Sequence, residues 1–450
     1  MMPSSNAATL TPKIGLSGLV FFGLSYMTIA VGMLIFGILS DTSENTTATA
    51  FVVATGVMLV TAVSYAKLSA AYPKSGSVYS YARNLLGGRA GFLSGWLLLL
   101  DYPFLPMVAT YLGALYLHAQ FTEIPLWGWL LGLTAIVTGI NIVGLKAADL
   151  VNKAFVVGSA IIVLIVMGLF VAHVATHPHG SYAAPFWHSG SQISGVTAAA
   201  AIAAYSFLGF DAITTLSEEA FDARRMVPRA LVLVVLIGGA VFTLVAYILQ
   251  LAIPSVDPST ADVAWYAALG NIAGYTVTNT LNVLLIIFSF SSAVAIQAGS
   301  SRLMYVMGRD GVLPRFFCGY LSRRFETPVL NIILIGAITL AGTAFDLSQA
   351  TSLINFGAFA AFTVVNICAI KYYLDARRAG GHRRGALVVG LLVPAFGVIA
   401  NVYLIFQLSS LAKILGISWF VVGVGWLVWL TRGLRREPPQ FSEAEALLAE

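Results

Sequence analysis

The chain has 450 residues, of which 58% are hydrophobic and only 10% are charged. Soluble proteins are about 25% charged, so a soluble globule of this length would lack the polar surface that it needs. Disordered, collagen-like and coiled-coil classes fail on composition too, and two cysteines make no disulfide framework. Composition therefore predicts an all-α protein that crosses a membrane many times.

Apolar runs long enough to cross a bilayer recur along the whole chain. The polar start through Pro12 has no cationic region and no cleavage site, so the first run is interpreted as a retained helix. The predicted spans are residues 17–39, 47–66, 92–117, 125–143, 153–174, 194–216, 230–253, 276–300, 328–345, 350–374, 386–408 and 411–431. The expected organisation is a cytoplasmic tail (1–16), five spans (17–174), five more (194–374), two last spans (386–431) and a cytoplasmic tail (432–450).

The basic residues predict the direction of these spans. With the N-terminus in the cytoplasm, all of the 24 lysines and arginines except Lys413 fall on the inner side. This bias places both termini and Cys318 in the cytoplasm, and the membrane is expected to be the cytoplasmic (inner) membrane. It also explains the net charge of +5 without a nucleic-acid partner, while the basic loops are suited to contact anionic lipid.

Two carboxylates, Asp101 and Asp211, lie at membrane depth. A buried charge in a bilayer is costly, so each is expected to face a cavity, an ion or a partner, and the alternative is a hydrogen bond between helices. Asp101 belongs to the long third span, in which Pro103 and Pro106 predict a kink.

The first and sixth spans mix glycine and hydroxyl residues in their middle, at residues 23–33 and 204–215. Glycine lowers the cost of leaving helical geometry, although small residues also serve ordinary helix packing. Because the two spans are five apart, the second copy would enter the membrane from the opposite side. Interrupted helices at matching positions of two inverted halves indicate a binding site between them at the bilayer midplane.

Three stretches carry a resemblance to a known family. They are YAKL with YPKSGSVYSY in residues 65–81, SFLGFD with TTLSEE in 206–219, and SRLMYVMGRDGVLP at 301–314. The sequence resembles the amino acid–polyamine–organocation transporters over nearly its whole length. It is most similar to their bacterial putrescine-importer branch, which LDYPFLPM at 100–107 and INFGA at 354–358 also resemble.

The resemblance implies a LeuT-like fold of twelve helices with a five-plus-five inverted repeat, whose first and sixth helices are broken. The substrate would lie between these two helices, and the third and eighth would line the site. The residues expected to bind substrate, from the resemblance or, for Tyr102 and Gly209, from the kinked third span and the broken sixth span, are Ala30, Val31, Gly32, Tyr102, Tyr205, Ser206, Leu208, Gly209 and Asp211. Asp101, Glu218 and Glu219 are expected to act in coupling or gating.

Two departures from the family pattern affect the substrate and the coupling ion. Putrescine importers of this branch carry a proline and a carboxylate in the first helix, and residues 29–35 hold neither. Proton-coupled relatives place a lysine in the fifth helix, where this chain has Gly158. The coupling ion therefore stays open between proton and sodium. Ser289, Ser291 and Ser292 could offer oxygens to sodium, or they serve helix packing.

The function predicted is secondary active transport of an organic amine by alternating access, with putrescine or a polyamine first and an amino acid second. The sequence has no phosphate-binding loop for ATP, and neither an enzyme activity nor a cofactor is expected. No metal site is expected either, because the histidines around one outer loop lack accompanying cysteines. These histidines are His173, His177, His179 and His188.

Two alternatives come from other classes. An intramembrane aspartyl protease would use Asp101 and Asp211 as a catalytic pair. That family shows Tyr-Asp and Gly-x-Gly-Asp, whereas this chain reads Asp101-Tyr102 and lacks the second glycine before Asp211. A channel is the other alternative, but no ring of charges or filter motif is visible.

Overall fold

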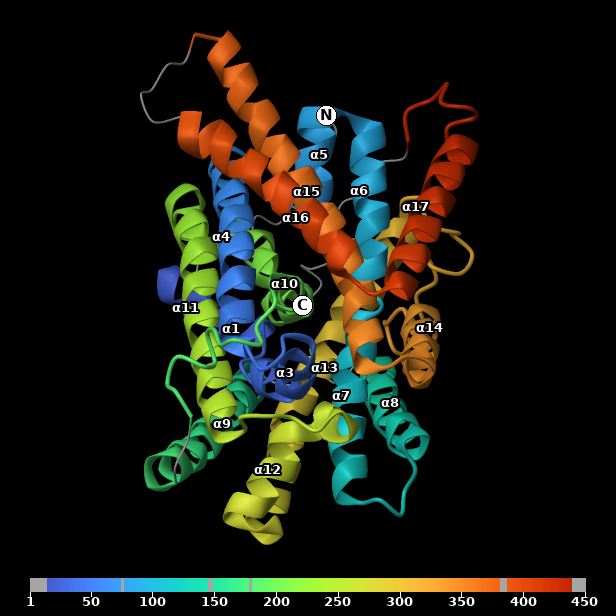
Figure 1. Cartoon of the computed structure of the whole chain (residues 1–450). Coiled ribbons are helices and arrows are strands. Elements are labelled where there is room, and N and C mark those ends of the chain that lie inside the picture. The colour runs from blue at the N-terminus through green and yellow to red at the C-terminus, as the bar shows by residue number, and fades with distance from the viewer. Residues whose placement is uncertain (1–13, 74–76, 145–148, 178–179, 381–386, 439–450) are drawn as a thin grey trace.

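The computed structural model describes residues 14–73, 77–144, 149–177, 180–380 and 387–438. Within these ranges the regular structure is helical, and extended pairing is limited to one parallel bridge between Ile14 and Ala220. Eleven helical segments are long and apolar enough to cross a membrane, and the shorter apolar segment Val329–Ala344 stands where the ninth span is expected. The predicted all-α membrane fold is confirmed (Figure 1).

The helices follow the predicted spans in chain order. The first six spans comprise α1 (Leu16–Tyr26), α2 (Val31–Leu34), α3 (Phe36–Thr42), α4 (Thr47–Ala71), α5 (Val78–Leu86), α6 (Gly88–Asp101), α7 (Leu105–Gln120), α8 (Leu126–Val143), α9 (Asp149–Thr176), α10 (Ile193–Ala203), η1 (Ala204–Phe207) and η2 (Phe210–Glu219). The remainder comprises α11 (Ala223–Ala252), η3 (Pro258–Val263), α12 (Ala264–Ala273), α13 (Tyr275–Arg309), α14 (Val329–Leu340), η4 (Ala341–Ala344), α15 (Leu347–Arg378), η5 (Val388–Leu392), α16 (Val393–Gln407) and α17 (Ser410–Leu430).

Both predicted helix breaks are present. The first span stops at the end of α1 and resumes at α2, and between them Thr28 has a φ of 49°, which non-glycine residues rarely adopt. The sixth span tightens into η1, leaves helical geometry at Leu208 and resumes as η2 after Gly209, which has a φ of 94°. Interrupted helices of this kind are where membrane transporters offer backbone groups to a solute.

The third span has the kink that its prolines predict. It divides into α6 and α7, with Tyr102, Pro103 and Phe104 between them. Pro106 has no N–H to give to the Tyr102 carbonyl four residues earlier, so this carbonyl needs another donor. Ser300 of α13 provides it, because its Oγ donates to the Tyr102 oxygen at 2.6 Å. The kink is thereby tied to the eighth span.

The second and seventh spans, α4 and α11, lie side by side along their length, and α1 packs against α11 (Figure 1). On the other flank α15 packs against α6, where Gly357 lies against the Leu97 carbonyl. Trp96 and Trp419 join α6 to α17 by stacking and by donating their ring N–H groups to each other's carbonyl oxygens at 2.9 and 3.0 Å.

The bounds of the inverted repeat, 17–174 and 194–374, stay a prediction.

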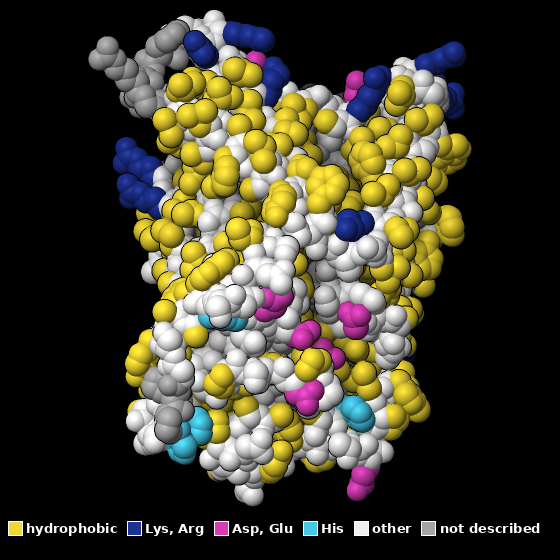
Figure 2. Space-filling model, viewed as in Figure 1, with side chains coloured by type: hydrophobic (Ala, Val, Ile, Leu, Met, Phe, Trp, Pro, Cys, Tyr) yellow, Lys and Arg dark blue, Asp and Glu magenta, His cyan; other side chains and the backbone are white. Residues whose placement is uncertain are grey.

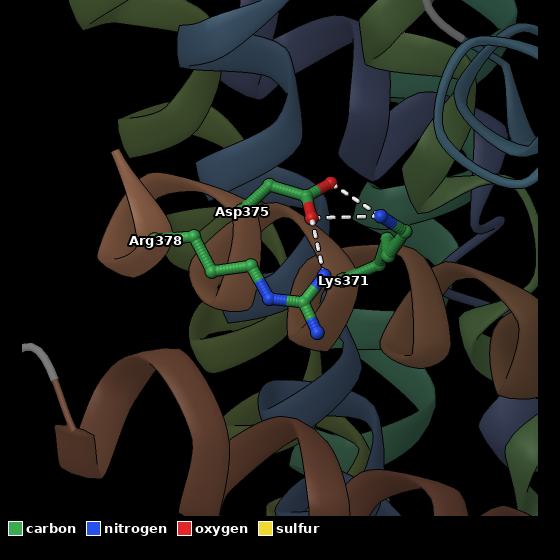
Figure 3. A network of polar contacts seen from close by, with 3 residues as sticks. All are labelled: Lys371, Asp375 and Arg378. Atoms are coloured by element: carbon green, nitrogen blue, oxygen red, sulfur yellow. Dashed lines mark hydrogen bonds and ion pairs between the residues drawn. The ribbon is translucent and has the colours of Figure 1, made fainter. Parts of the chain in front are cut away.

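Charge is distributed unevenly between the two ends of the bundle. In Figure 2 most visible lysines and arginines lie in the upper half, and the acidic side chains gather mainly in the lower half. At the end of α15, Lys371 Nζ lies 2.6 Å from Asp375 Oδ2 and Arg378 Nη1 lies 3.9 Å from Asp375 Oδ1 (Figure 3). These side chains are partly exposed, so each pair contributes at most about 1 kcal/mol.

Candidate functional site

The two helix breaks meet at one tyrosine. A Cβ placed on Gly209 would overlap the ring of Tyr26, the last residue of α1. A Cβ placed on Gly299 of α13 would lie 3.8 Å from the Tyr26 hydroxyl. The end of α1, the break of the sixth span and the last third of α13 therefore converge there.

Polar residues with some exposed surface lie beside these breaks. Asp101, Tyr102, Gly209 and Asp211 are each partly exposed. Their chain neighbours are buried: Leu100, Leu208 and Phe210. Because a carboxylate facing lipid is costly, we attribute the exposed surface of the two aspartates to an internal space of the bundle. The structure thus brings together the kinked third span and the broken sixth span around polar groups.

Asp211 is held by a tyrosine from the second span. The Tyr65 hydroxyl donates to Asp211 Oδ2 at 3.2 Å, although 146 positions separate the two residues. The Tyr65 ring is fully buried and lies edge-on to Phe210, Phe362 and Tyr81, with ring centroids 5.6, 6.1 and 6.2 Å away. This aromatic cluster closes one side of Asp211.

Asp101 has an unsatisfied oxygen. Its Oδ1 is buried without a hydrogen-bond partner among the described residues, as are Ser206 Oγ and Asn355 Oδ1. An unpaired buried polar atom costs about 1–3 kcal/mol, so such atoms are natural contacts for a solute or water. Asp101 also lies within electrostatic range of Asp211 and Tyr205.

Asn355 anchors the tenth span to the sixth. Its Nδ2 donates to the Ala201 carbonyl at 2.7 Å, one helical turn before Tyr205. Sequence reasoning did not single out Asn355 or Tyr65 as site residues. The signal for both was their place in the quoted motifs INFGA and YAKL, which carry no chemistry of their own.

The first-span residues predicted to offer backbone lie at the edge of the break. The Ala30 carbonyl accepts from Met33 and Leu34, and Val31 N donates to Thr28 O at 2.9 Å. A Cβ on Gly32 would meet the Phe242 ring of α11 at 2.7 Å, so this glycine permits close helix packing. Whether these groups contact a substrate stays a prediction.

Of the two glutamates predicted to act in gating, Glu219 accepts a hydrogen bond on its backbone oxygen from Ile14 N at 2.9 Å. The Glu218 side chain lies outside the described part of the structure. Nearby, Arg225 Nε lies 3.7 Å from Asp222 Oδ2 in an exposed ion pair. The segment before α1 is therefore joined to the end of the sixth span through backbone contacts.

The histidines of the outer loop make local contacts. His173 and His177 stack with ring centroids 4.2 Å apart, and His188 Nε2 lies 2.7 Å from the Glu44 carbonyl oxygen. His179 lies outside the described residues. Among those described, no group of three or more His, Cys, Asp or Glu residues could hold a metal ion.

Two cavities lie away from the helix breaks. One, of about 460 Å³, is a groove on the outside of α4 and α11. The other, of about 40 Å³, is enclosed by α7, α8 and α13 together with Leu34, and Ser289 is one of its few polar linings. The Ser291 side chain is not described. The sodium alternative therefore stays untested.

Comparison with known proteins gives consistent results. Residues 14–430 match the model of the amino acid permease family. The chain is 36% identical over 451 residues to the low-affinity putrescine importer PlaP of Escherichia coli (strain K12), covering 98% of each chain. It is 26% identical over 411 residues to the branched-chain amino acid permease BcaP of Bacillus subtilis (strain 168), covering 85% of this chain and 83% of BcaP.

Among solved structures, the chain is similar to a manganese transporter of Eremococcus coleocola. The TM-score is 0.54 at 15% identity, and the likeness covers 97% of this chain and 99% of the other. At this identity the likeness shows a shared fold, which is that of a membrane transporter.

Proposed function

Because the chain belongs to the amino acid permease family, we propose that it is a secondary transporter of an organic amine in the cytoplasmic membrane. The two halves of the fold would rock around a solute held at the helix breaks, opening the site to one side at a time. A proton or a sodium ion would couple the movement, and both termini would lie in the cytoplasm. The protease and channel alternatives gain no support from the relatives.

The observation that carries this proposal is the pair of membrane-depth carboxylates beside the breaks. An amine needs a counter-charge in a bilayer, and Asp101 and Asp211 lie in one polar region with Tyr102 and Tyr205. The tyrosine rings suit cation–π contact with an ammonium group. A diamine, with an ammonium group at each end, matches two carboxylates better than a single-amine solute does.

Putrescine is therefore the first substrate that we propose, which agrees with the 36% identity to PlaP. The first helix lacks the acidic residue of the putrescine-importer branch, so Asp101 and Asp211 would supply the negative charge instead. An amino acid is the second candidate, in view of the likeness to BcaP. Its single ammonium group would need only one of the two carboxylates.

Counter-flow in liposomes tests the proposal. Purified protein is reconstituted into vesicles that contain unlabelled putrescine, and the entry of labelled putrescine is followed. We expect saturable counter-flow of labelled putrescine, and external unlabelled putrescine should compete with it. The double variant that carries Asp101→Asn and Asp211→Asn should show no counter-flow. Counter-flow of amino acids without any of putrescine would reverse the order of substrates. Flux that shows neither counter-flow nor saturation would indicate a channel.

A further inference from the structure

The two carboxylates of the candidate site lie at opposite kinds of helix end. Asp101 is the last residue of α6, whereas Asp211 lies in the first turn of η2, directly after the break at Gly209. A helix carries partial positive charge at its N-terminus and partial negative charge at its C-terminus, so an anion is favoured at the first and disfavoured at the second. The backbone therefore favours a negative charge on Asp211 and disfavours one on Asp101.

Hydrogen bonding separates the two aspartates in the same order. The Tyr65 hydroxyl donates to Asp211 Oδ2 at 3.2 Å. Among the described residues no side chain gives Asp101 a hydrogen bond or an ion pair, and its Oδ1 is buried. A donor favours the ionised form of a carboxylate, and burial without a donor favours the protonated form. This observation is independent of the helix ends and leads to the same conclusion.

The two aspartates also influence each other, because they lie within electrostatic range. The other titratable side chains that lie around them are tyrosines, namely Tyr26 of α1, Tyr65 of α4, Tyr81 of α5, Tyr102 of the kink and Tyr205 of η1. On the side of α15, a Cβ on Gly357 would lie 3.2 Å from Asp101 N, so this face brings no charge. Two carboxylates in one apolar region ionise together only at high cost, so one of them keeps a proton.

No described basic residue neutralises the pair. The basic side chains on the helices around the two aspartates are Lys67 on α4, Arg83 on α5, Arg89 on α6, Arg224, Arg225 and Arg229 on α11, Arg302 and Arg309 on α13, Lys371, Arg377 and Arg378 on α15, and Lys413 on α17. Within the described ranges, none of them forms an ion pair or a hydrogen bond with Asp101 or Asp211. Arg83, for example, lies beside Gly91, which precedes Asp101 by about 15 Å along α6.

We propose that Asp211 is the permanent counter-charge of the site and that Asp101 holds a proton until a diamine binds. The second ammonium group of the diamine then replaces this proton. The O–H bond of Asp101 breaks, the proton passes to the solvent, and the carboxylate that remains pairs with the ammonium group. A solute with one ammonium group uses Asp211 and leaves Asp101 protonated. This inference rests on the proposed function and assigns the two carboxylates different roles in it.

Competition between a proton and a diamine has a measurable consequence. If one proton leaves for each putrescine that binds, the affinity for putrescine should rise about tenfold for each pH unit while free Asp101 stays protonated. The affinity for n-butylamine, which has the same four carbons and one ammonium group, should not change over that range. The proton and the second ammonium group exclude each other at Asp101, which is the condition for their exchange.

Isothermal titration calorimetry on the unmodified protein counts the protons. Putrescine is titrated into purified protein in detergent, at one pH, in phosphate, HEPES and Tris buffers, which differ in their enthalpy of ionisation. The slope of the binding enthalpy against the ionisation enthalpy of the buffer gives the number of protons released. We expect about one proton for each putrescine and none for each n-butylamine. Putrescine binding by the unmodified protein without proton release overturns this inference and leaves the proposed function intact.

Two matched variants separate the roles of the carboxylates. Asp101→Asn should release no proton when putrescine binds, and it should bind n-butylamine as the parent does. Asp211→Asn should weaken the binding of both amines by at least about tenfold, because it removes the charge that each of them needs. Asp222→Asn, at an exposed ion pair, is the control and should keep the release of one proton. Gel filtration establishes that each variant is monodisperse.

The outcomes distinguish this inference from the proposal on which it rests. Proton release that persists in Asp101→Asn and disappears in Asp211→Asn would reverse the two roles and overturn the inference. An n-butylamine affinity that falls in Asp101→Asn as far as it falls in Asp211→Asn overturns it as well. If no amine binds to the unmodified protein in any buffer, the proposed function fails and the inference fails with it.

Discussion

Gly209 and Tyr26 touch across the two helix breaks, and only glycine fits at position 209. Its φ of 94° is one that L side chains rarely adopt, and the space where a Cβ would stand is occupied by the Tyr26 ring. The break of the sixth span and the end of α1 are therefore built as one unit. In the proposed transport cycle these two segments would have to move together.

Gly209→Leu should abolish uptake while the protein still reaches the membrane. The added side chain would collide with Tyr26 and force the backbone out of its left-handed conformation. Gly168→Ala in α9 is the matched control, because nothing lies within 4 Å of the Cβ that it would add. Uptake is measured in liposomes, and folding by gel filtration in detergent. Normal transport by Gly209→Leu would contradict the role of the break.

Tyr102→Ala should weaken putrescine binding by about tenfold, since a desolvated cation–π contact is worth up to about 2 kcal/mol. Tyr102→Phe keeps the ring and separates ring contact from hydroxyl contact. Binding is measured by isothermal titration calorimetry on purified protein. The kink itself should persist, because Ser300 bonds the backbone oxygen of residue 102. Binding by Tyr102→Ala that equals the parent's would remove Tyr102 from the site.

Asp101→Asn should change the pH dependence of uptake, in addition to the loss of putrescine affinity that follows from removing one of the two counter-charges. The Asp101 Oδ1 atom is buried without a partner, so a proton or a coupling ion is the natural charge to meet it. Uptake is measured at several pH values on either side of neutrality. Asp222→Asn, at an exposed ion pair, is the control and should leave the profile unchanged. An unchanged profile for Asp101→Asn would exclude its role in coupling.

The two helix breaks and the kink of the third span could be predicted from the sequence, because local chemistry determines them. Glycine and hydroxyl residues mark the breaks, and Pro106 releases the Tyr102 carbonyl. The partners of these groups depend on tertiary packing, which no local pattern encodes. Tyr65 reaches Asp211 across 146 positions, and Ser300 reaches Tyr102 across 198. The polar region could be located from the sequence, but its hydrogen bonds could not.

Two aspartates outside the membrane spans should affect stability in opposite directions. Burial and the negative charge of Asp346 raise the pKa of Asp262. Hydrogen bonds from Ser259 lower the pKa of Asp257, whose Oδ1 accepts from Ser259 N at 2.8 Å. Ionisation of Asp262 therefore favours the unfolded chain above its unfolded pKa of about 3.9, whereas ionisation of Asp257 favours the folded chain there.

At pH 7, Asp262→Asn should accordingly raise the thermal midpoint in detergent, and Asp257→Asn should lower it. The Asp262 difference should shrink as the pH falls toward about 4, because the folded pKa of Asp262 lies above its unfolded value. The Asp257 difference should shrink only below about pH 4, between the unfolded pKa and the lower folded pKa. Differential scanning fluorimetry at several pH values measures the midpoints. Shifts of equal sign, or shifts that do not change with pH, would contradict the assigned causes.

The orientation of the chain is tested best at Phe316, next to Cys318. Cys318 itself is buried, and burial raises the pKa of its thiol to about 11, so it would react poorly from either side of the membrane. Phe316 is 85% exposed in the same loop. If this loop is cytoplasmic, Phe316→Cys should escape a membrane-impermeant maleimide in intact cells and react after permeabilisation. Glu123→Cys, at the opposite end of the bundle, is the control and should react in intact cells. Strong labelling of Phe316→Cys before permeabilisation would show that the chain has the opposite orientation.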